Sequence, residues 1–436
     1  MSINFYSIKS LLNIKDENII FDDGFYSKKK INYQDTHIFY AKLTYNPSAC
    51  TCCGVVNENN IIVKNGFKLS TIKLLPICNL PAILKLKKQR FLCRDCSCSF
   101  MASSTFVDSY CNISNDVKNA VLSDLMDVAS IKDIAKKWFI SSSSVLRVLK
   151  RVSVLKKDFS YLPEFICMDE FKSVRSESFN MSFVFMDALS RKIIDILPDR
   201  RIHKLIAYFN RFPMEIRKKV KGVVIDMYEP YISLIKDVFP NASIIFDRFH
   251  VVQNLTRALD KTRISVMNSL DRDSKEYKVL KRYWRLFLKY EYDLNYTNFY
   301  RYVHFNRLMS QASVVSFMRG VNPILDESYK CIKDAMAAIR LSDTDMLQNV
   351  INRYEGSKLI SEKVRTAITT TKEYEKYIEN AVKFSFSNGP LEGTITKIKL
   401  IKRISYGYRN FNNLKRRIIL CMYKLQYIEK DPGVAS

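Results

Sequence analysis

Two short apolar runs that each end in acid decide the fold of this chain: EFICMDEF at residues 164–171 and VKGVVIDM at residues 220–227. Apolar runs of this length, rich in Val, Ile and Phe, are typical of buried β-strands. Asp169 lies near the end of the first run, and Asp226 lies near the end of the second. We therefore predict two strands that each carry an aspartate.

The segments around these runs alternate between strand and helix patterns. After the first run, the sequence predicts strands at 180–189 and 192–197, then a helix at 203–212; after the second run, it predicts a helix at 230–239 and a strand at 242–249. Three strands followed by helix–strand units is the element order of a ribonuclease-H-like α/β domain. In that fold the first and fourth strands are neighbours, so we expect Asp169 and Asp226 to lie close together.

The stretch 252–383 has the Leu, Ile, Tyr and Phe spacing of helices. Its only glycines and proline are Gly320, Gly356 and Pro323. We predict that this stretch is a large all-α insertion in the α/β domain. It lies between Asp226 and a third acid, Glu392, in SNGPLEGTITKIKLIK at 387–402. Pro390 marks a helix start there, and this final helix would return Glu392 to the two aspartates.

Three carboxylates in these positions can hold a pair of divalent cations against a phosphodiester. We therefore predict a catalytic, Mg²⁺-binding triad of Asp169, Asp226 and Glu392, with Mn²⁺ as the alternative ion. Each acid also has a structural interpretation. Asp169 could simply end a strand, and Asp226 could cap a helix. Glu392 could lie near a helix start only because the helix dipole stabilises a carboxylate there.

Three neighbouring residues compete with this triad. Glu170 should point to the opposite face of its strand from Asp169, because side chains alternate along a strand. Asp247, in FDRFH, fits a structural or DNA-facing residue better than a metal ligand. His250 fits a hydrogen-bonding residue at a helix start better than a ligand, because Mg²⁺ prefers oxygen.

The charge balance indicates a polyanionic partner. The chain has 70 Lys and Arg against 44 Asp and Glu, a net charge of +26, which suits a nucleic-acid-binding protein. The alternative is the amino-acid usage of an AT-rich genome. The first 20 residues lack a signal-peptide pattern, and no apolar run reaches the roughly 18 residues of a membrane span. We expect a protein of the cytoplasm or nucleoid with no membrane partner.

The cysteines form two closely spaced pairs. Cys50 and Cys53 lie in CTCCG, and Cys93 and Cys96 lie in CRDC. Each two-residue gap lets both thiolates hold one tetrahedral Zn²⁺ from a tight turn, so we predict a zinc ribbon with one structural ion. Cys52 and Cys98 are close enough to replace a ligand. We expect no disulfides. We interpret Cys167, Cys331 and Cys421 as buried reduced cysteines of the core.

The segment SIKDIAKKWFISSSSVLRVLKRV at 130–152 has the pattern of a helix-turn-helix, although ordinary helical hairpins share that pattern. The turn falls at 139–140. Val145, Leu146, Val148 and Leu149 should face inward. The predicted DNA-binding residues are Ser141, Ser142, Ser143, Ser144, Arg147, Lys150 and Arg151.

A second basic surface is predicted near the C-terminus. Residues 397–424 hold nine basic residues and no acidic ones, interleaved with aromatic side chains. They could follow a phosphate backbone, or they could form a solvated helix face. The predicted DNA-binding residues are Lys399, Lys402, Arg403 and Arg409.

These motifs together resemble the ISL-three family of bacterial insertion-sequence transposases. The resemblance extends from about residue 50 to 425 and is most specific in VVIDMYEPYISLIKDVFPNASIIFDRFHVVQ and SNGPLEGTITKIKLIKRISYGYRNF. It implies a DDE transposase with a ribonuclease-H-like core, whose three acids, here Asp169, Asp226 and Glu392, bind two Mg²⁺ ions. It also implies N-terminal zinc and DNA-binding domains that recognise the terminal inverted repeats of the element. The same site would join the cut ends to target DNA, in a homodimer or larger assembly.

We predict a multidomain α+β chain with four parts. Residues 1–110 are an N-terminal region with the zinc ribbon, and 111–157 are the helix-turn-helix. Residues 158–251 and 384–436 form the catalytic core, and 252–383 form the insertion. Two other functions remain open from the sequence: a zinc-dependent DNA-binding regulator, and a ribonuclease-H-like nuclease without strand transfer.

Overall fold

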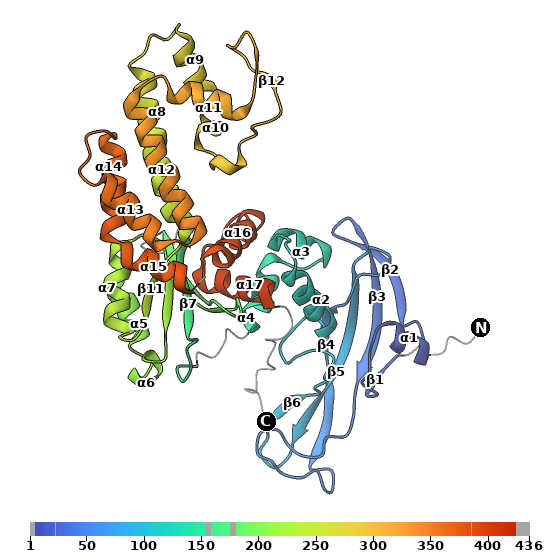
Figure 1. Ribbon diagram of the computed structural model, residues 1–436. Coiled ribbons are helices and arrows are strands. Elements are labelled where there is room, and N and C mark those ends of the chain that lie inside the picture. The colour runs from blue at the N-terminus through green and yellow to red at the C-terminus, as the bar shows by residue number, and fades with distance from the viewer. Residues whose placement is uncertain (1–4, 22, 153–157, 175–179, 385, 424–436) are drawn as a thin grey trace. The chain divides into compact units, whose positions relative to one another are not determined.

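The computed structural model describes residues 5–21, 23–152, 158–174, 180–384 and 386–423. The chain divides into two compact units (Figure 1). The N-terminal unit comprises residues 1–157, 174–176 and 397–436, and the central unit comprises residues 158–173 and 177–396. Among the described helices, none is both long enough and apolar enough to cross a membrane.

A six-stranded sheet forms the first part of the N-terminal unit. Its main path is β1-β3-β5-β4, with β2 also paired to β3 and β6 paired to β5. The helix α1 (Phe5–Leu11) precedes β1 (Ile19–Ile20), β2 (Tyr26–Ile31), β3 (Gln34–Leu43), β4 (Ile62–Lys73), β5 (Ala82–Cys93) and β6 (Ser99–Met101). Leu84 and Leu86 of β5 are fully buried, whereas Lys85 between them is half-buried and Lys87 after them is exposed. This alternation gives the sheet one apolar face and one basic face.

Four helices complete the N-terminal unit: α2 (Asn115–Met126), α3 (Ile131–Lys137), α4 (Ser142–Arg151) and α17 (Phe411–Tyr423). Val121 of α2, Val145 of α4 and Leu420 of α17 belong to one apolar core. The nearly buried guanidinium of Arg417 donates from Nη2 to the carbonyl oxygens of Asp127 and Ala129, both at 2.8 Å.

The position of α17 differs from the predicted domain division, which placed all of 384–436 in the α/β core. Residues 397–436 are grouped with the N-terminal unit instead, and α16 (Gly389–Ile404) contributes residues to both units. The physical reason lies in α17, whose apolar face fills the core of α2 and α4 and whose Arg417 satisfies two carbonyl groups there.

The central unit contains a five-stranded sheet of order β11-β10-β7-β8-β9. Its strands are β7 (Phe165–Lys172), β8 (Met181–Asp187), β9 (Ile193–Leu197), β10 (Gly222–Ile225) and β11 (Ser243–Phe246), and its helices include α5 (Ile202–Phe209), α6 (Met214–Arg217) and α7 (Glu229–Val238). Strands β7, β8 and β9 are antiparallel, whereas β10 pairs in parallel with both β7 and β11. These elements follow the predicted order of three strands and then helix–strand units.

The register between β7 and β10 fixes where the two aspartates lie. The last paired residues are Cys167 and Val224. Asp169, within β7, and Asp226, directly after the end of β10, each come two residues after this pair on adjacent parallel strands. The close approach of the strands is aided by Gly222, where an added Cβ would come within 2.8 Å of the Phe165 ring.

The remainder of the central unit is the insertion. Its helices are α8 (Arg248–Asn268), α9 (Lys275–Arg282), α10 (Trp284–Leu288), α11 (Gln311–Arg319), α12 (Pro323–Leu341), α13 (Thr344–Tyr354), α14 (Glu362–Glu373) and α15 (Glu375–Phe384), with a short 3₁₀ helix at Glu291–Asp293. The insertion shares one continuous apolar core with the sheet. Helix α15 also lies along β11, where Asn380 Nδ2 donates to the Ile244 carbonyl at 2.8 Å.

The prediction that the insertion is entirely helical is wrong in one place. Strands β12 (Tyr300–Arg301) and β13 (Leu308–Met309) pair as a short antiparallel ladder. They lie in the segment 289–310, where Asn, Tyr and Thr residues replace the regular apolar spacing of the flanking helices. Without an apolar stripe to bury, this segment cannot form a stable amphipathic helix.

Candidate metal centre and DNA-binding surfaces

Asp169 lies on β7 in an acidic surrounding. Its Oδ1 accepts a hydrogen bond from the backbone N–H of Glu170 at 2.6 Å. Burial raises the pKa of Asp169 to about 7, despite that hydrogen bond, and the charges of Asp226, Glu170 and Glu392 act in the same direction as burial. A half-buried carboxyl group facing other carboxylates is a favourable place for a cation.

Asp226 directly follows β10 and is held by the segment that leads into α16. The fully buried Asn388 donates from Nδ2 to the Met168 carbonyl at 3.3 Å and to Asp226 Oδ1 at 3.4 Å. One amide group therefore spans the ends of β7 and β10. Burial raises the pKa of Asp226, and the neighbouring His250 opposes that increase.

Glu392 lies in the first turn of α16, four residues after Asn388, and its N–H bonds the Asn388 carbonyl at 2.9 Å. Its Oε1 is 3.2 Å from His250 Nε2, and the same nitrogen is 3.1 Å from Asp226 Oδ1. The histidine thus connects the second and third acids of the predicted triad. All three acids and His250 belong to the central unit.

Asp247 is closer to this centre than the sequence suggested. It is 2% exposed and caps α8 by accepting from the Phe249 N–H at 3.3 Å. Ligand atoms of Asp226, Asp247 and His250 all lie within 4.8 Å of one another, a spacing that could hold one metal ion. The signal in the sequence was the Asp–Arg–Phe–His order, which places a helix cap and the residue three positions later on the same turn.

Glu170 was predicted to point away from Asp169, but it faces the same cavity. It lines the same cavity of about 580 Å³ as Asp169 and Asp226. Strand β7 continues beyond the end of β10, so no neighbouring strand on that side separates the two faces at this point. Glu170 pairs with Arg200 and accepts from the Tyr231 hydroxyl at 3.2 Å.

The two cysteine pairs meet in the N-terminal unit. Sγ atoms of Cys50, Cys53, Cys93 and Cys96 all lie within 4.8 Å of one another. Cys50 Sγ is 3.7 Å from Cys96 Sγ, and backbone N–H groups of Cys53 and Cys52 lower the pKa of Cys50 to about 7. Gly54, with φ of +77°, makes the turn expected after the first pair. Four thiol groups in this arrangement fit a closed tetrahedral zinc site.

Cys52 and Cys98 are joined by a disulfide bond. The prediction of no disulfides is therefore wrong for this pair, and neither residue belongs to the four-cysteine cluster. The bond forms because both loops that carry the cluster also bring these flanking cysteines together, with Cα atoms 6.5 Å apart. Cys167, Cys331 and Cys421 are buried free cysteines, as predicted.

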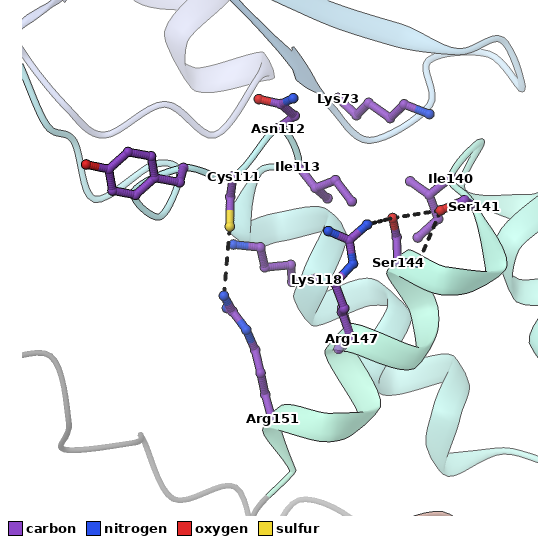
Figure 2. Close-up of a pocket in the computed structure, with 12 residues that line it drawn as sticks. Lys73, Cys111, Asn112, Ile113, Lys118, Ile140, Ser141, Ser144, Arg147 and Arg151 are labelled. Carbon is purple, nitrogen blue, oxygen red and sulfur yellow. Dashed lines mark hydrogen bonds between the residues drawn. The ribbon is translucent and has the colours of Figure 1, made fainter. Parts of the chain in front are cut away.

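Helices α3 and α4 meet at the predicted turn, where Phe139 has φ of +51°. Ser141 caps α4 by accepting from the Ser144 N–H at 3.2 Å. Ser142 and Ser143 are exposed, but Ser144 is 7% exposed and bonds Arg147 Nη2 at 3.2 Å (Figure 2). Ser144 is therefore more buried than the other three serines, although it lines the same cavity as Arg147.

The basic residues of α4 differ in their surroundings. Lys150 is exposed, and Arg147 lines a cavity of about 490 Å³ together with Lys73, Lys118 and Arg151 (Figure 2). Arg151 was predicted to be free for DNA, but its Nη1 pairs with Asp108 at 2.5 Å. Leu146 is only half-buried, whereas its neighbours Val145, Val148 and Leu149 form the core.

The predicted C-terminal surface lies on α16 and the loop after it. Lys399, Arg403 and Arg409 are exposed, and Lys402 is half-buried. In contrast, Lys415 and Arg417 of α17 are buried, so the basic character of this stretch is divided between surface and interior.

Two family models match this chain. Residues 166–418 match the ISL3 DDE family described as transposase, and residues 46–96 match the zinc finger of transposases of IS204, IS1001, IS1096 and IS1165. The transposase for insertion sequence element IS1001 from Bordetella parapertussis is 25% identical over 250 residues, which cover 56% of this chain and 59% of that protein. A protein named ATP-dependent protease from Lactococcus lactis subsp. lactis is 29% identical over 112 residues, covering 26% of this chain and 35% of that protein.

The alignments thus span between about one third and three fifths of the length of these two relatives. The family match includes the strands that carry Asp169 and Asp226 and the helix that carries Glu392, and the zinc-finger match includes all four clustered cysteines. Because the transposase match covers more than half of the sequence, this chain belongs to the ISL3 family of DDE transposases.

Proposed function

We propose that this protein is a DNA transposase that binds the terminal inverted repeats of its insertion sequence and catalyses metal-dependent cleavage and strand transfer. The observation that carries the proposal is the convergence of three acids from distant parts of the chain. Asp169 lies on β7 and Asp226 directly follows the adjacent parallel strand β10, while His250 links Asp226 to Glu392. The family membership of the chain supports the same activity.

The sheet of the central unit supports a ribonuclease-H-like core. Counting its strands in chain order gives 3-2-1-4-5 from β9 to β11, with the first three antiparallel and the last two parallel to the first. The insertion follows the fifth strand, and α16 comes after the insertion. This arrangement leaves the carboxyl ends of the first and fourth strands open to a substrate.

The donor set fits hard divalent cations. Asp169, Asp226 and Glu392 offer carboxylate oxygens, which Mg²⁺ and Mn²⁺ prefer. Burial, aided by the charges of neighbouring carboxylates, raises the pKa of Asp169, and a bound cation would stabilise its charged form. We propose two Mg²⁺ ions at these acids, which when bound would activate the attacking hydroxyl and neutralise charge on the phosphodiester.

The proposed reaction has two steps, and each is an in-line displacement at phosphorus. In the first step water attacks the phosphorus at the element end, and the P–O3′ bond breaks to leave a free 3′-hydroxyl. In the second step that 3′-hydroxyl attacks a phosphodiester of target DNA, and a target 3′-oxygen leaves. Bond exchange is direct in both steps, so no covalent intermediate with the protein is required.

We assign recognition of the DNA ends to the N-terminal unit. The four-cysteine cluster, with one structural Zn²⁺, would stiffen the loops of the sheet, while α3 and α4 would act as a helix-turn-helix. Ser142, Ser143, Arg147 and Lys150 would meet DNA, together with Lys399, Lys402, Arg403 and Arg409. Ser141 would keep its capping role. Two ends must be held together, so we propose a homodimer or larger assembly that acts in the cytoplasm.

A cleavage assay with one isosteric variant tests the proposal. Asp226→Asn removes one charge and leaves the size of the side chain unchanged, so it should abolish Mg²⁺-dependent cutting of a terminal-repeat duplex. Binding of the same duplex should remain close to that of the unchanged protein. If both proteins bind but neither cuts, a zinc-dependent regulator is the better assignment. If the unchanged protein cuts but never joins pre-cleaved 3′-ends to target DNA, it is a nuclease.

A further inference from the structure

Helix α8 presents one polar face to the cavity of the metal centre. His250, Gln253, Asn254 and Arg257 follow the i, i+3, i+4, i+7 spacing that aligns side chains along a helix. All four line the cavity of about 580 Å³ that also contains Asp169 and Asp226. The opposite face of α8 is apolar and buried through Val251, Leu255, Ala258 and Leu259. The amphipathic pattern therefore turns polar groups specifically toward this cavity.

Arg257 is the positive charge of this face. Its side chain is exposed and has no hydrogen-bond or ion-pair partner among the residues that the structure describes. The nearby acids that do not belong to the triad have other partners. Glu170 pairs with Arg200, and Glu229 accepts from the Tyr374 hydroxyl at 3.0 Å. The guanidinium therefore keeps its donors available for a ligand in the cavity.

The walls of the cavity limit which ligands Arg257 can bind. Thr370 and Tyr374, from the end of α14, also line it, so the polar face of α8 does not lie on an open convex surface. A planar guanidinium that faces a water-accessible cavity suits a phosphate group, which it can bind through two parallel hydrogen bonds. Gln253 and Asn254 can add neutral hydrogen bonds to the same backbone.

The spacing along α8 relates this site to the reacting bond. Seven residues separate His250 from Arg257, which corresponds to about 10 Å at 1.5 Å per residue. The axis of duplex DNA advances about 3.4 Å per base pair and the path between successive phosphates of one strand is longer, so about 10 Å corresponds to at most roughly three nucleotide steps. A strand whose scissile phosphodiester lies at the triad would then bring another phosphate of the same strand to Arg257.

We propose that Arg257, assisted by Gln253 and Asn254, binds a backbone phosphate within about three nucleotides of the cleavage point. This positioning site rests on the proposed function, since it assumes that DNA enters the cavity. Arg257 does not touch the reacting atoms. It fixes the register of the strand, so that one phosphodiester and not its neighbour faces the three acids.

The test pairs a protein change with a DNA change. Terminal-repeat duplexes are made with a single uncharged methylphosphonate at each of the positions flanking the cleavage point, in turn. Binding is measured with Ca²⁺ and cutting with Mg²⁺, for the unchanged protein and for Arg257→Gln. At one position the methylphosphonate should weaken binding and cutting of the unchanged protein about tenfold. At that same position the methylphosphonate should have no further effect on the Arg257→Gln protein, because the DNA change and the protein change remove the same contact.

Arg272→Gln is the matched control. Arg272 is exposed in the turn after α8 and does not line the cavity, so its removal changes the net charge equally. Arg257→Gln should lower the slope of log affinity against log salt by about 0.9, and Arg272→Gln should leave it unchanged. If the losses of affinity caused by the methylphosphonate and by Arg257→Gln multiply at every position, Arg257 binds no specific phosphate. The same conclusion follows if Arg257→Gln and Arg272→Gln behave alike. If the unchanged protein binds no duplex at all, the proposed function fails and this site fails with it.

Discussion

His250 and Glu392 are 142 positions apart in the chain, yet Nε2 of the histidine lies 3.2 Å from Oε1 of the glutamate. The contact joins the first turn of α8 to the first turn of α16, on either side of the insertion. Since Asp226 Oδ1 is 3.1 Å from the same nitrogen, His250 orients two acids at once. We expect its replacement to disturb the geometry of the acids more than the stability of the fold.

His250→Ala should reduce Mg²⁺-dependent cleavage by about 10- to 100-fold, the usual cost of losing a residue that orients metal ligands. His250→Gln keeps a hydrogen-bonding group and should recover part of the loss. Cleavage rates at several Mg²⁺ concentrations provide the measurement, with thermal unfolding as the control for folding. Equal losses in the two variants, with no change in the Mg²⁺ requirement, would argue against an orienting role.

Zinc removal should affect the N-terminal unit selectively. Cys50→Ser breaks the four-thiol cluster and should release zinc, because three remaining thiolates cannot complete a tetrahedral site. Cys52→Ser should retain one zinc per chain, since Cys52 bonds Cys98 and lies outside the cluster. Metal content of the purified variants is the measurement. Loss of zinc from both variants would show that Cys52 is needed for metal binding.

The contact between Gly222 and Phe165 predicts a clash that a second substitution can relieve. Gly222→Ala places a Cβ 2.8 Å from Phe165 Cδ1 and should lower the free energy of unfolding by about 1–3 kcal/mol. Phe165→Leu removes the ring edge, so the alanine should cost less in that background. Denaturant unfolding of the four proteins of this cycle measures the coupling. Additive effects would show that the strands adjust without strain.

Arg417 should matter for stability although it is a basic residue in a protein with an excess of positive charge. Arg417→Met would leave the Asp127 and Ala129 carbonyls without its hydrogen bonds, at a cost of about 2–4 kcal/mol for two unsatisfied groups. Arg403→Met, at an exposed position of α16, is the control and should be close to neutral. Thermal unfolding distinguishes them, and a neutral Arg417→Met would mean that water replaces the guanidinium.

The sequence was sufficient to locate features that follow from local periodicity. Asp169 and Asp226 could be placed at one end of the sheet because strand runs and element order determine which strands are adjacent. The cysteine pairs could be grouped because a two-residue gap suits a single ion. The turn at Phe139 could be placed because the apolar spacing breaks there.

Other features depended on contacts between distant segments, which periodicity does not encode. Asp247 fitted a structural or DNA-facing residue better than a metal ligand until the start of α8 could be placed beside Asp226. Glu170 obeyed strand alternation, but that rule predicts separate environments only where neighbouring strands continue on both sides. Arg417 looked like a surface cation in a basic stretch, and only the carbonyls after α2 explain its burial.

The length and starting point of α8 have a mechanical consequence. A helix of 21 residues extends about 30 Å, and its start, from the cap residue Asp247 to His250, carries two ligand atoms within 4.8 Å of a carboxylate oxygen of Asp226. Helix α8 is therefore an element that the insertion and the candidate metal centre share. Excising the insertion would not yield a smaller working nuclease, because the cut would remove the rod that keeps Asp247 and His250 in place.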